Sequence, residues 1–309
     1  MGSKVTAAWE ASERRAAWGF LLPSLCLYTL YIIFPVIYTF YLSVTEWDGI
    51  ADFPLPLCWV DQSRSCFENF RELWSDEVFW TSLKNNMIWL VFFSISPLIG
   101  LGLALFFHVK GPIGSLYKSL VYMPMVFSLV VVGLIWGWFL QPEFGLVEYL
   151  LKSWGLMQPG DQLGMMASFQ WANAGLILAA CWPHAAYCMV LYLAGLSNLQ
   201  RNVIEAAMID GANGWQVFRH VIFPMLRPAT IIVAIVTMIG ALRTFELVAI
   251  MTGGGPANAS NVLANYMYQQ TFLNFRYGYG AAIAVVLFVI SLGLIVLYLH
   301  QARKQGESF

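Results

Sequence analysis

The chain has 309 residues, of which 59% are hydrophobic and 11% are charged, and its formal net charge is −1. Soluble globular domains carry about 25% charged residues. This composition, with a mean hydropathy of +0.67, therefore excludes an ordinary soluble domain and favours a membrane protein. So small a net charge does not indicate a nucleic-acid partner, and we expect none.

Six apolar runs are long enough to cross a bilayer, which takes about 20 helical residues. A transmembrane β-barrel would instead show alternating segments of about ten residues. We therefore predict an all-α, polytopic membrane protein with six transmembrane helices in one domain over residues 1–309. The predicted spans lie near residues 18–42, 80–107, 118–140, 171–196, 228–251 and 279–300.

The first apolar run is too long for the hydrophobic region of a signal peptide, and no small-residue cleavage site follows Tyr41. We expect it to be kept as a span. Lys and Arg are enriched in cytoplasmic loops. The side that would hold both termini carries ten of them and the other side carries five, which predicts that both termini are cytoplasmic.

The predicted external loop over residues 43–79 contains Cys58 and Cys66. Two cysteines on the oxidising side of the membrane are candidates for a disulfide. Two unpaired thiols are the alternative, because the sequence does not give the distance between them. Cys26, Cys181 and Cys188 lie within predicted spans, where we expect them to act as small apolar side chains.

A charged segment, EAAMIDGANGWQVFRHVIFPML at residues 205–226, separates the fourth and fifth predicted spans. Residues 201–210 are predicted to form a helix with Asn202 as its N-cap, and residues 215–223 a second helix after a turn at Gly211. This helix–turn–helix exposes Glu205 and Asp210 beside apolar side chains. It suits insertion into a groove of a cytosolic partner, and an amphipathic connector on lipid headgroups is the alternative.

This segment resembles the EAA loop of the membrane subunits of ABC importers, whose pattern is E-A-A-x3-G-x9-I-x-L-P. The matching residues are Glu205, Ala206, Ala207, Gly211 and Pro224, with Val221 and Phe223 in place of Ile and Leu. The stretches at 67–86, 245–256 and 277–288 resemble the carbohydrate-uptake, maltose-type branch of that family. The resemblance covers nearly the whole chain.

The resemblance implies an ABC importer permease bundle in a bacterial plasma (inner) membrane. The loop would dock as a coupling helix on a cytosolic ATPase dimer through Glu205, Ala206, Ala207, Asp210 and Gly211. It also implies a second, related permease subunit and an extracytoplasmic solute-binding protein. The function implied is alternating-access import of a carbohydrate-like solute, such as a saccharide, a glycoside or a polyol.

The chain is not expected to hydrolyse ATP. No Walker A sequence G-x4-G-K-[ST] occurs, and the dipeptide Gly-Lys is absent. We also predict no catalytic residue and no metal site, because no cluster of ligating residues stands in a convincing context. ATP and Mg would be used by the separate ATPase subunits, with no cofactor on this chain.

A polar path for the solute is sought in the fifth predicted span. Thr237, Gly240, Ala241 and Thr244 are spaced i, i+3, i+4 and i+7, so they share one helix face. These small and partly hydroxylated side chains could form the lining of the solute path. The alternative is a surface for close helix packing, where small residues are equally favoured.

Charged and aromatic residues near this face are further candidates. Arg243 and Glu246 are charged residues inside a span, and they either gate the path or contact solute, or pair with each other to hold the bundle. Pro183 interrupts the fourth span, and His184 and Tyr187 follow it. This break frees carbonyl groups for a ligand, or it is a packing kink.

Two other classes of function are compatible with a membrane protein of this size. An ion-gradient-driven secondary transporter usually has more spans, inverted repeats and buried carboxylates, which this sequence lacks. A membrane scaffold subunit without a transport path would make no use of Glu205. The sequence does not identify the solute or show which permease subunit binds it.

Overall fold

The computed structural model describes residues 16–45, 47–49, 67–108, 112–158, 161 and 164–304. Helices are the only regular elements of more than one residue within these ranges, which confirms the predicted all-α class. Five helices are long and apolar enough to cross a membrane, or six if one bent pair counts as a single span. Cys58 and Cys66 lie outside the described residues.

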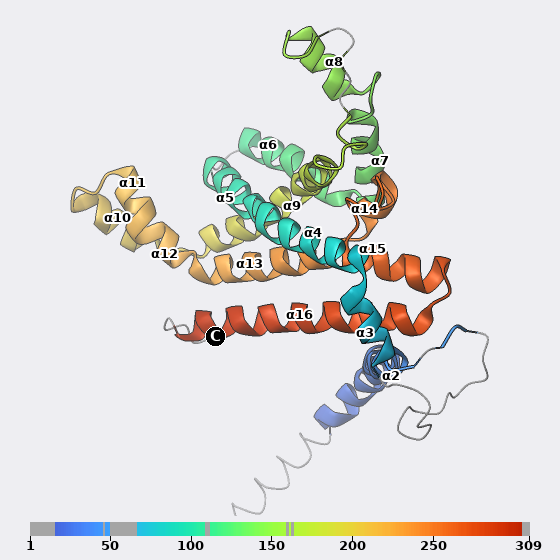
Figure 1. Ribbon diagram of the computed structural model, residues 1–309. Helices are drawn as coiled ribbons and strands as arrows, with labels where there is room; N and C mark the ends of the chain where they lie inside the picture. Colours follow the sequence, from blue (N-terminus) through green and yellow to red (C-terminus); the bar gives the residue numbers. More distant parts are fainter. Residues whose placement is uncertain are drawn as a thin grey trace, which may run out of the picture. The chain divides into compact units, whose positions relative to one another are not determined.

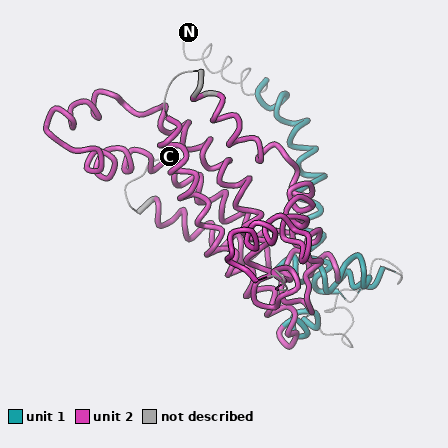
Figure 2. Tube along the Cα trace, turned by 90° about the horizontal axis from the view of Figure 1, so that it is seen from above, with its two compact units in different colours: residues 1–73, 270–285 teal, residues 74–269, 286–309 magenta. Residues whose placement is uncertain are grey.

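The chain divides into two compact units, coloured separately in Figure 2. The smaller unit comprises residues 1–73 and 270–285, and the larger comprises residues 74–269 and 286–309. Helix α16 (Tyr277–Lys304) belongs to both units, because its first turns lie in the smaller one and the remainder in the larger.

The smaller unit contains a long apolar helix at Ala16–Ser43, which includes the π-helical turn η1 (Thr29–Ile33) and α2 (Phe34–Ser43). No residue of its most apolar stretch is buried by the described residues. The Asn69 side chain, on α3 (Glu68–Ser75), donates hydrogen bonds to Ser43 O at 3.0 Å and Thr45 O at 2.7 Å. Within the smaller unit the helix is therefore held at its end.

The larger unit is built around α9 (Ala172–Ser197), which packs against most of its long helices. These are α4 (Glu77–Phe93) with α5 (Ile95–Phe107), and α7 (Leu129–Phe139) and α13 (Arg227–Leu242). The approach of α5 to α9 requires Gly100, where an added Cβ would lie 2.5 Å from the Cβ of Cys188. Figure 1 shows α4, α5 and α13 running alongside α9.

The third predicted span is not one helix. It comprises α6 (Pro112–Tyr122), the 3-10 turn η2 (Met123–Val126) and α7, and the chain bends by 97° between Leu116–Val126 and Leu129–Phe139. Pro124 has no N–H to continue the ladder, and Ser128 is extended and caps α7 from its side chain. The span predicted near residues 118–140 is therefore a bent pair of helices, which counts as one span only if both halves are taken together.

The fifth predicted span is broken as well. Helix α13 ends at Leu242, and the short helix α14 (Glu246–Met251) begins after three non-helical residues. Phe245, in this break, has φ −138° and ψ −57°, outside the α-helical range.

The remaining helices of the unit are α8 (Leu146–Ser153), α10 (Arg201–Ile209), α11 (Gly214–Val217), η3 (Phe218–Ile222), α12 (Phe223–Met225), α15 (Leu263–Tyr268) and η4 (Gln269–Leu273, which begins in this unit).

The buried side chain of Asn86 supplies a partner for a carbonyl at this break and for an N–H at the start of α15. Its Nδ2 donates to the carbonyl of Leu242, the last residue of α13, at 3.2 Å, and its Oδ1 accepts from Leu263 N, at the start of α15, at 2.9 Å. Asn86 is fully buried. One amide on α4 therefore joins the end of one helix to the beginning of another.

The neighbouring Asn85 anchors the loop that precedes α15. Its Nδ2 donates to the carbonyls of Ala259 and Asn261, both at 2.8 Å, and its Oδ1 accepts from Nδ2 of Asn173 on α9 at 2.8 Å. Asn85 is buried too. The loop is therefore fixed to α4 and α9 by side-chain amides.

Replacing Asn86 by Ala is expected to destabilise the larger unit, because it leaves a buried carbonyl and a buried N–H without partners. Each such loss costs about 1–3 kcal/mol. We expect a lower midpoint of heat unfolding in detergent for Asn86→Ala. Lys84→Ala, an exposed position on the same helix, is the control and should unfold like the wild type. Equal midpoints for all three proteins would contradict this role.

Candidate translocation cavity and coupling segment

A cavity of about 490 Å³ lies inside the larger unit, beside both breaks. It is bounded by α9 and α13 and by the residues on either side of the two interruptions. Its lining consists of Phe93, Met125, Phe127, Leu129, Ala180, Pro183, His184, Tyr187, Val236, Ile239, Gly240, Arg243, Thr244 and Leu247. Aromatic and aliphatic side chains therefore form most of the wall, with a few polar groups among them.

The breaks account for the position of this cavity. Non-helical backbone at membrane depth is tolerated only where it is buried in protein or lines a water-filled space, since lipid offers no hydrogen-bonding partners. At the second break, the hydroxyl of Thr244 donates to Gly240 O at 3.0 Å. Met125 and Phe127 line the cavity from the first break. Residues beside both interruptions therefore line one cavity.

Helix α9 contributes an ordered histidine. His184 Nε2 lies 2.9 Å from Thr237 Oγ1, and the hydroxyl of Thr237 donates to Val233 O at 2.7 Å. The single hydroxyl proton of Thr237 is used in the bond to Val233 O. The bond between His184 and Thr237 must therefore use a proton on Nε2 of His184, with Thr237 Oγ1 as the acceptor. The imidazole also packs on Phe93, with ring centroids 4.4 Å apart, and lies 6.0 Å from the Tyr187 ring.

The structure brings four of the predicted path residues to the cavity, namely His184, Tyr187, Arg243 and Thr244. The other three predicted path residues do not line it. Thr237 is buried behind His184, Ala241 is in the hydrophobic core, and Glu246 is the first residue of α14. Of the predicted face of small residues, Gly240 and Thr244 therefore line the cavity, whereas Thr237 and Ala241 are buried.

Phe93, Met125 and Phe127 also line the cavity, although the sequence pattern did not predict them. For Met125 and Phe127 the available signal was Pro124 followed by Ser128, which marks a helix break beside them, and no such signal marked Phe93. Arg243 and Glu246 both lie in the described part of the chain, and no ion pair joins them. The break between them removes the helical spacing on which that pairing depended.

The charged segment between α9 and α13 is anchored at one end. Val217 and Leu226 are buried, and Phe218 and Ile222 pack against a core cluster that includes Tyr192 of α9. An Asn213–Gln216 capping box starts α11, with N···O distances of 2.8 and 2.9 Å. The second half of the segment is therefore part of the folded core.

The first half of the segment is exposed. No residue of α10 is buried, and Met208 and Ile209 are 57% and 85% exposed. Glu205 and Asp210 are exposed beside them. Gly211 has φ +87°, a left-handed value that glycine adopts without strain, as the turn prediction requires. The predicted N-cap is wrong, because α10 begins at Arg201 after Gln200, one residue before Asn202.

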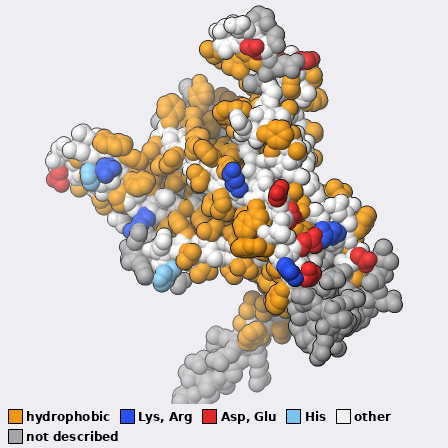
Figure 3. All heavy atoms as spheres, viewed as in Figure 1, with side chains coloured by type: hydrophobic (Ala, Val, Ile, Leu, Met, Phe, Trp, Pro, Cys, Tyr) orange, Lys and Arg blue, Asp and Glu red, His pale blue; other side chains and the backbone are white. Residues whose placement is uncertain are grey.

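In Figure 1, α10 and α11 lie beyond the end of α13, past α12. The same region in Figure 3 carries charged, histidine and hydrophobic side chains close together, whereas hydrophobic side chains cover most of the helices on that face. An amphipathic helix that covers no core of its own chain has an apolar surface available to a partner or to lipid.

The described residues hold no group of three or more His, Cys, Asp or Glu side chains placed to bind a metal ion. Of the cysteines in predicted spans, Cys188 is buried at the α5–α9 contact and Cys181 is partly buried. Cys26 is exposed on the uncovered first helix, so it does not fill a space within this chain.

Comparison with known proteins places the chain in a family. Residues 96–306 match the model of the binding-protein-dependent transport system inner membrane component. The chain belongs to this family. It is a multi-pass permease of the inner membrane and a transport protein rather than an enzyme.

The permease resembles named relatives along almost its whole length. It is 31% identical to the sulfoquinovosyl glycerol transport system permease protein SmoG of Agrobacterium fabrum, over 96% of this chain and 93% of that protein. It is 30% identical to the lactose transport system permease protein LacF of Rhizobium radiobacter, over 93% and 94%. The fold matches a chain of a bacterial ABC transporter for alginate import, with TM-score 0.79 and 21% identity over 97% and 100%.

If water reaches the cavity, a cysteine placed at Thr244 should react with a water-soluble thiol reagent, because only the thiolate is nucleophilic and a thiolate forms readily only in water. In a permease whose own five cysteines are replaced, we expect Thr244→Cys to be labelled by a charged methanethiosulfonate. Ile232→Cys, on the exposed apolar side of α13, should stay unlabelled. Labelling of Ile232→Cys alone would show that the cavity is dry.

Proposed function

We propose that the permease is the membrane subunit of an ATP-driven importer of a carbohydrate-like solute. The observation that carries this proposal is the family membership along most of the chain, together with relatives named for a glycoside and a disaccharide. In this proposal the solute is a saccharide, glycoside or polyol, delivered by an extracytoplasmic solute-binding protein. A second, related permease subunit completes the pathway.

The cavity beside the two breaks is proposed as the solute-binding part of the path. Tyr187 and Phe127 offer aromatic surface for the apolar face of a sugar ring, and Arg243 and Thr244 offer hydrogen-bonding groups. The Nε2–H assigned to His184 leaves its Nδ1 as an acceptor for a hydroxyl group. Such a mixture of rings and a few polar groups is typical of small-molecule sites.

The segment over residues 205–224 is proposed as the docking site for the cytosolic ATPase dimer, which would bind ATP and Mg. Support comes from the exposed amphipathic helix α10, whose charged Glu205 and Asp210 adjoin apolar Ala206 and Ala207. The anchored second half of the segment, from Val217 to Leu226, continues into α13, which lines the cavity. Displacement of α10 would thus reach the cavity through a continuous, packed path.

The overall test is ATP hydrolysis by the permease purified with its co-purifying subunits in lipid, measured with a panel of sugars and the solute-binding protein. Stimulation by one sugar that requires the binding protein is the expected result. Uptake that continues without ATP while an ion gradient is maintained would favour a secondary transporter instead.

Glu205→Ala is expected to uncouple the permease from its ATPase while leaving it in the membrane. Truncating a central interface residue costs about 2 kcal/mol or more of docking free energy, which is about thirtyfold in affinity. Gly211→Pro should act likewise, because proline cannot adopt φ +87°. Solute-stimulated ATP hydrolysis is the measurement, with Glu77→Ala, an exposed carboxylate on α4, as the control. Full stimulation in both coupling variants would refute the assignment.

Thr244→Trp is expected to block uptake by filling the cavity, while the complex still assembles with its ATPase. An indole is large relative to a space of about 490 Å³ that must also hold the solute. Uptake of labelled sugar into vesicles is the measurement. Ile232→Trp, on the exposed side of α13, adds the same group outside the cavity and should transport normally. Unchanged uptake by Thr244→Trp would remove this residue from the path.

A further inference from the structure

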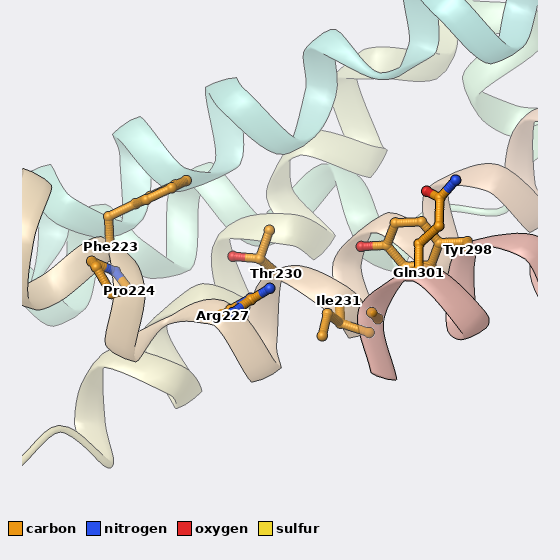
Figure 4. Close-up of a pocket in the computed structure, with 8 residues that line it drawn as sticks. Phe223, Pro224, Arg227, Thr230, Ile231, Tyr298 and Gln301 are labelled. Carbon is orange, nitrogen blue, oxygen red and sulfur yellow. The ribbon is translucent and has the colours of Figure 1, made fainter. Parts of the chain in front are cut away.

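Arginines at the two ends of α13 line separate hollows of the larger unit. Arg227, at the start of the helix, lines a hollow of about 430 Å³. Figure 4 shows Arg227 on the same helix as Thr230, with Tyr298 and Gln301 on α16. Arg227 and Tyr298 both have interaction partners already, so Arg227 is not a free charge. Arg243, just past the other end of the helix, lines the cavity beside the two breaks.

The guanidinium of Arg243 has no partner among the described residues. The side chain is exposed where it lines the cavity, and no hydrogen bond or ion pair of the described residues includes it. Glu246 is partly buried and is not among the described lining residues. A cation can bind the last carbonyls of a helix, but Leu242 O accepts from Asn86 instead. Arg243 therefore serves neither an ion pair nor a helix cap within the described part of the chain.

An unbalanced positive charge is costly at this position. Arg243 lies within the candidate span Arg227–Met251. Charged side chains inside a membrane face the protein interior or a water-filled space, and they pair with a countercharge or mark the path of a solute. None of the described residues that line the cavity is an Asp or a Glu. The negative charge that balances Arg243 is therefore expected from a molecule that enters the cavity.

Another polar group of the cavity has the reverse preference. His184 donates from Nε2 to Thr237, which leaves Nδ1 of the neutral imidazole as an acceptor. An acceptor suits a hydroxyl proton and repels an anion. Thr237 precedes Arg243 by six residues, which is about 9 Å along a helix. A solute with hydroxyl groups at one end and an acidic group at the other matches this arrangement.

We propose that Arg243 binds the acidic group of the transported solute, and that this solute is a saccharide with a carboxylate or a phosphate. The planar fork of guanidinium donors binds either group through two parallel hydrogen bonds. The proposal rests on the proposed import function and narrows it from carbohydrates in general to acidic ones. A neutral saccharide would leave the guanidinium without a countercharge whenever the cavity excludes water.

The charge of the cavity is measured first, without any solute. The protein is the permease with its own five cysteines replaced and with Thr244→Cys, in lipid with its co-purifying subunits. Labelling rates are compared for the anionic sulfonatoethyl and the cationic trimethylammonioethyl methanethiosulfonates, each corrected for its rate with glutathione. We expect Arg243 to favour the anionic reagent about tenfold, since a charged cleft concentrates ions of opposite sign.

Three variants identify the source of that preference. Arg243→Gln should abolish it and Arg243→Lys should keep it, which a merely structural role of the arginine would not predict. Arg71→Gln, which removes an exposed arginine of α3 outside the cavity lining, is the matched control and should keep it as well. No preference for the anionic reagent while Arg243 is intact would show that a carboxylate neutralises this arginine, and it would overturn the proposal.

The class of solute is measured next, by ATP hydrolysis of the complex with its solute-binding protein. The probes are matched neutral and acidic sugars, namely glucose with glucuronate and glucose 6-phosphate, and galactose with galacturonate and galactose 6-phosphate. We expect stimulation by an acidic sugar. Arg243→Gln should lower it about tenfold or more, because a hydrogen-bonded charge pair is lost, whereas Arg243→Lys and Arg71→Gln should keep most of it.

The two proposals fail in different ways. Stimulation by neutral sugars alone, equal in the wild type and in Arg243→Gln, would overturn the acidic class and leave the import function standing. Uptake that continues without ATP would refute the import function instead, and the labelling preference would still show whether Arg243 is a free charge in the cavity.

Discussion

The larger unit depends on one constraint, which is that backbone N–H and C=O groups inside a membrane must find partners within the protein. Unbroken helices meet it by themselves. The permease interrupts two of its spans, near residues 123–128 and 243–245, and supplies side chains in place of the lost bonds. Asn86 bonds Leu242 O, and Thr244 bonds Gly240 O. Ser128 caps α7.

The location of the cavity follows from that constraint. Irregular backbone at membrane depth is tolerated where it lines a water-filled space, and residues beside both breaks line the same cavity with side chains of α9. His184, itself bonded to Thr237, adds a fixed imidazole to the same space. The cavity thus combines aromatic walls with the polar side chains of His184, Arg243 and Thr244.

The segment between α9 and α13 combines a fixed half and an exposed half. Burial of Val217 and Leu226 ties the fixed half to the core, whereas α10 buries none of its residues in this chain. In the most apolar stretch of the helix at Ala16–Ser43, no residue is buried by the described residues. Both features are consistent with membership of a multi-subunit transporter, in which surfaces left open by one chain are completed by lipid or by other subunits.

The sequence alone determined the helical class, the number of apolar runs and the turn at Gly211, because hydrophobic length and glycine conformation are local properties. It also marked Glu205 and its neighbours by their spacing. Pro124 and Ser128 marked the break at 123–128 locally, whereas the break at 243–245, the split of Thr237 and Ala241 from Thr244, and the lining by Phe93 were decided only by tertiary structure. They depend on which side chain from another helix, such as Asn86 on α4, reaches a freed carbonyl, and no periodicity within a single segment encodes that contact.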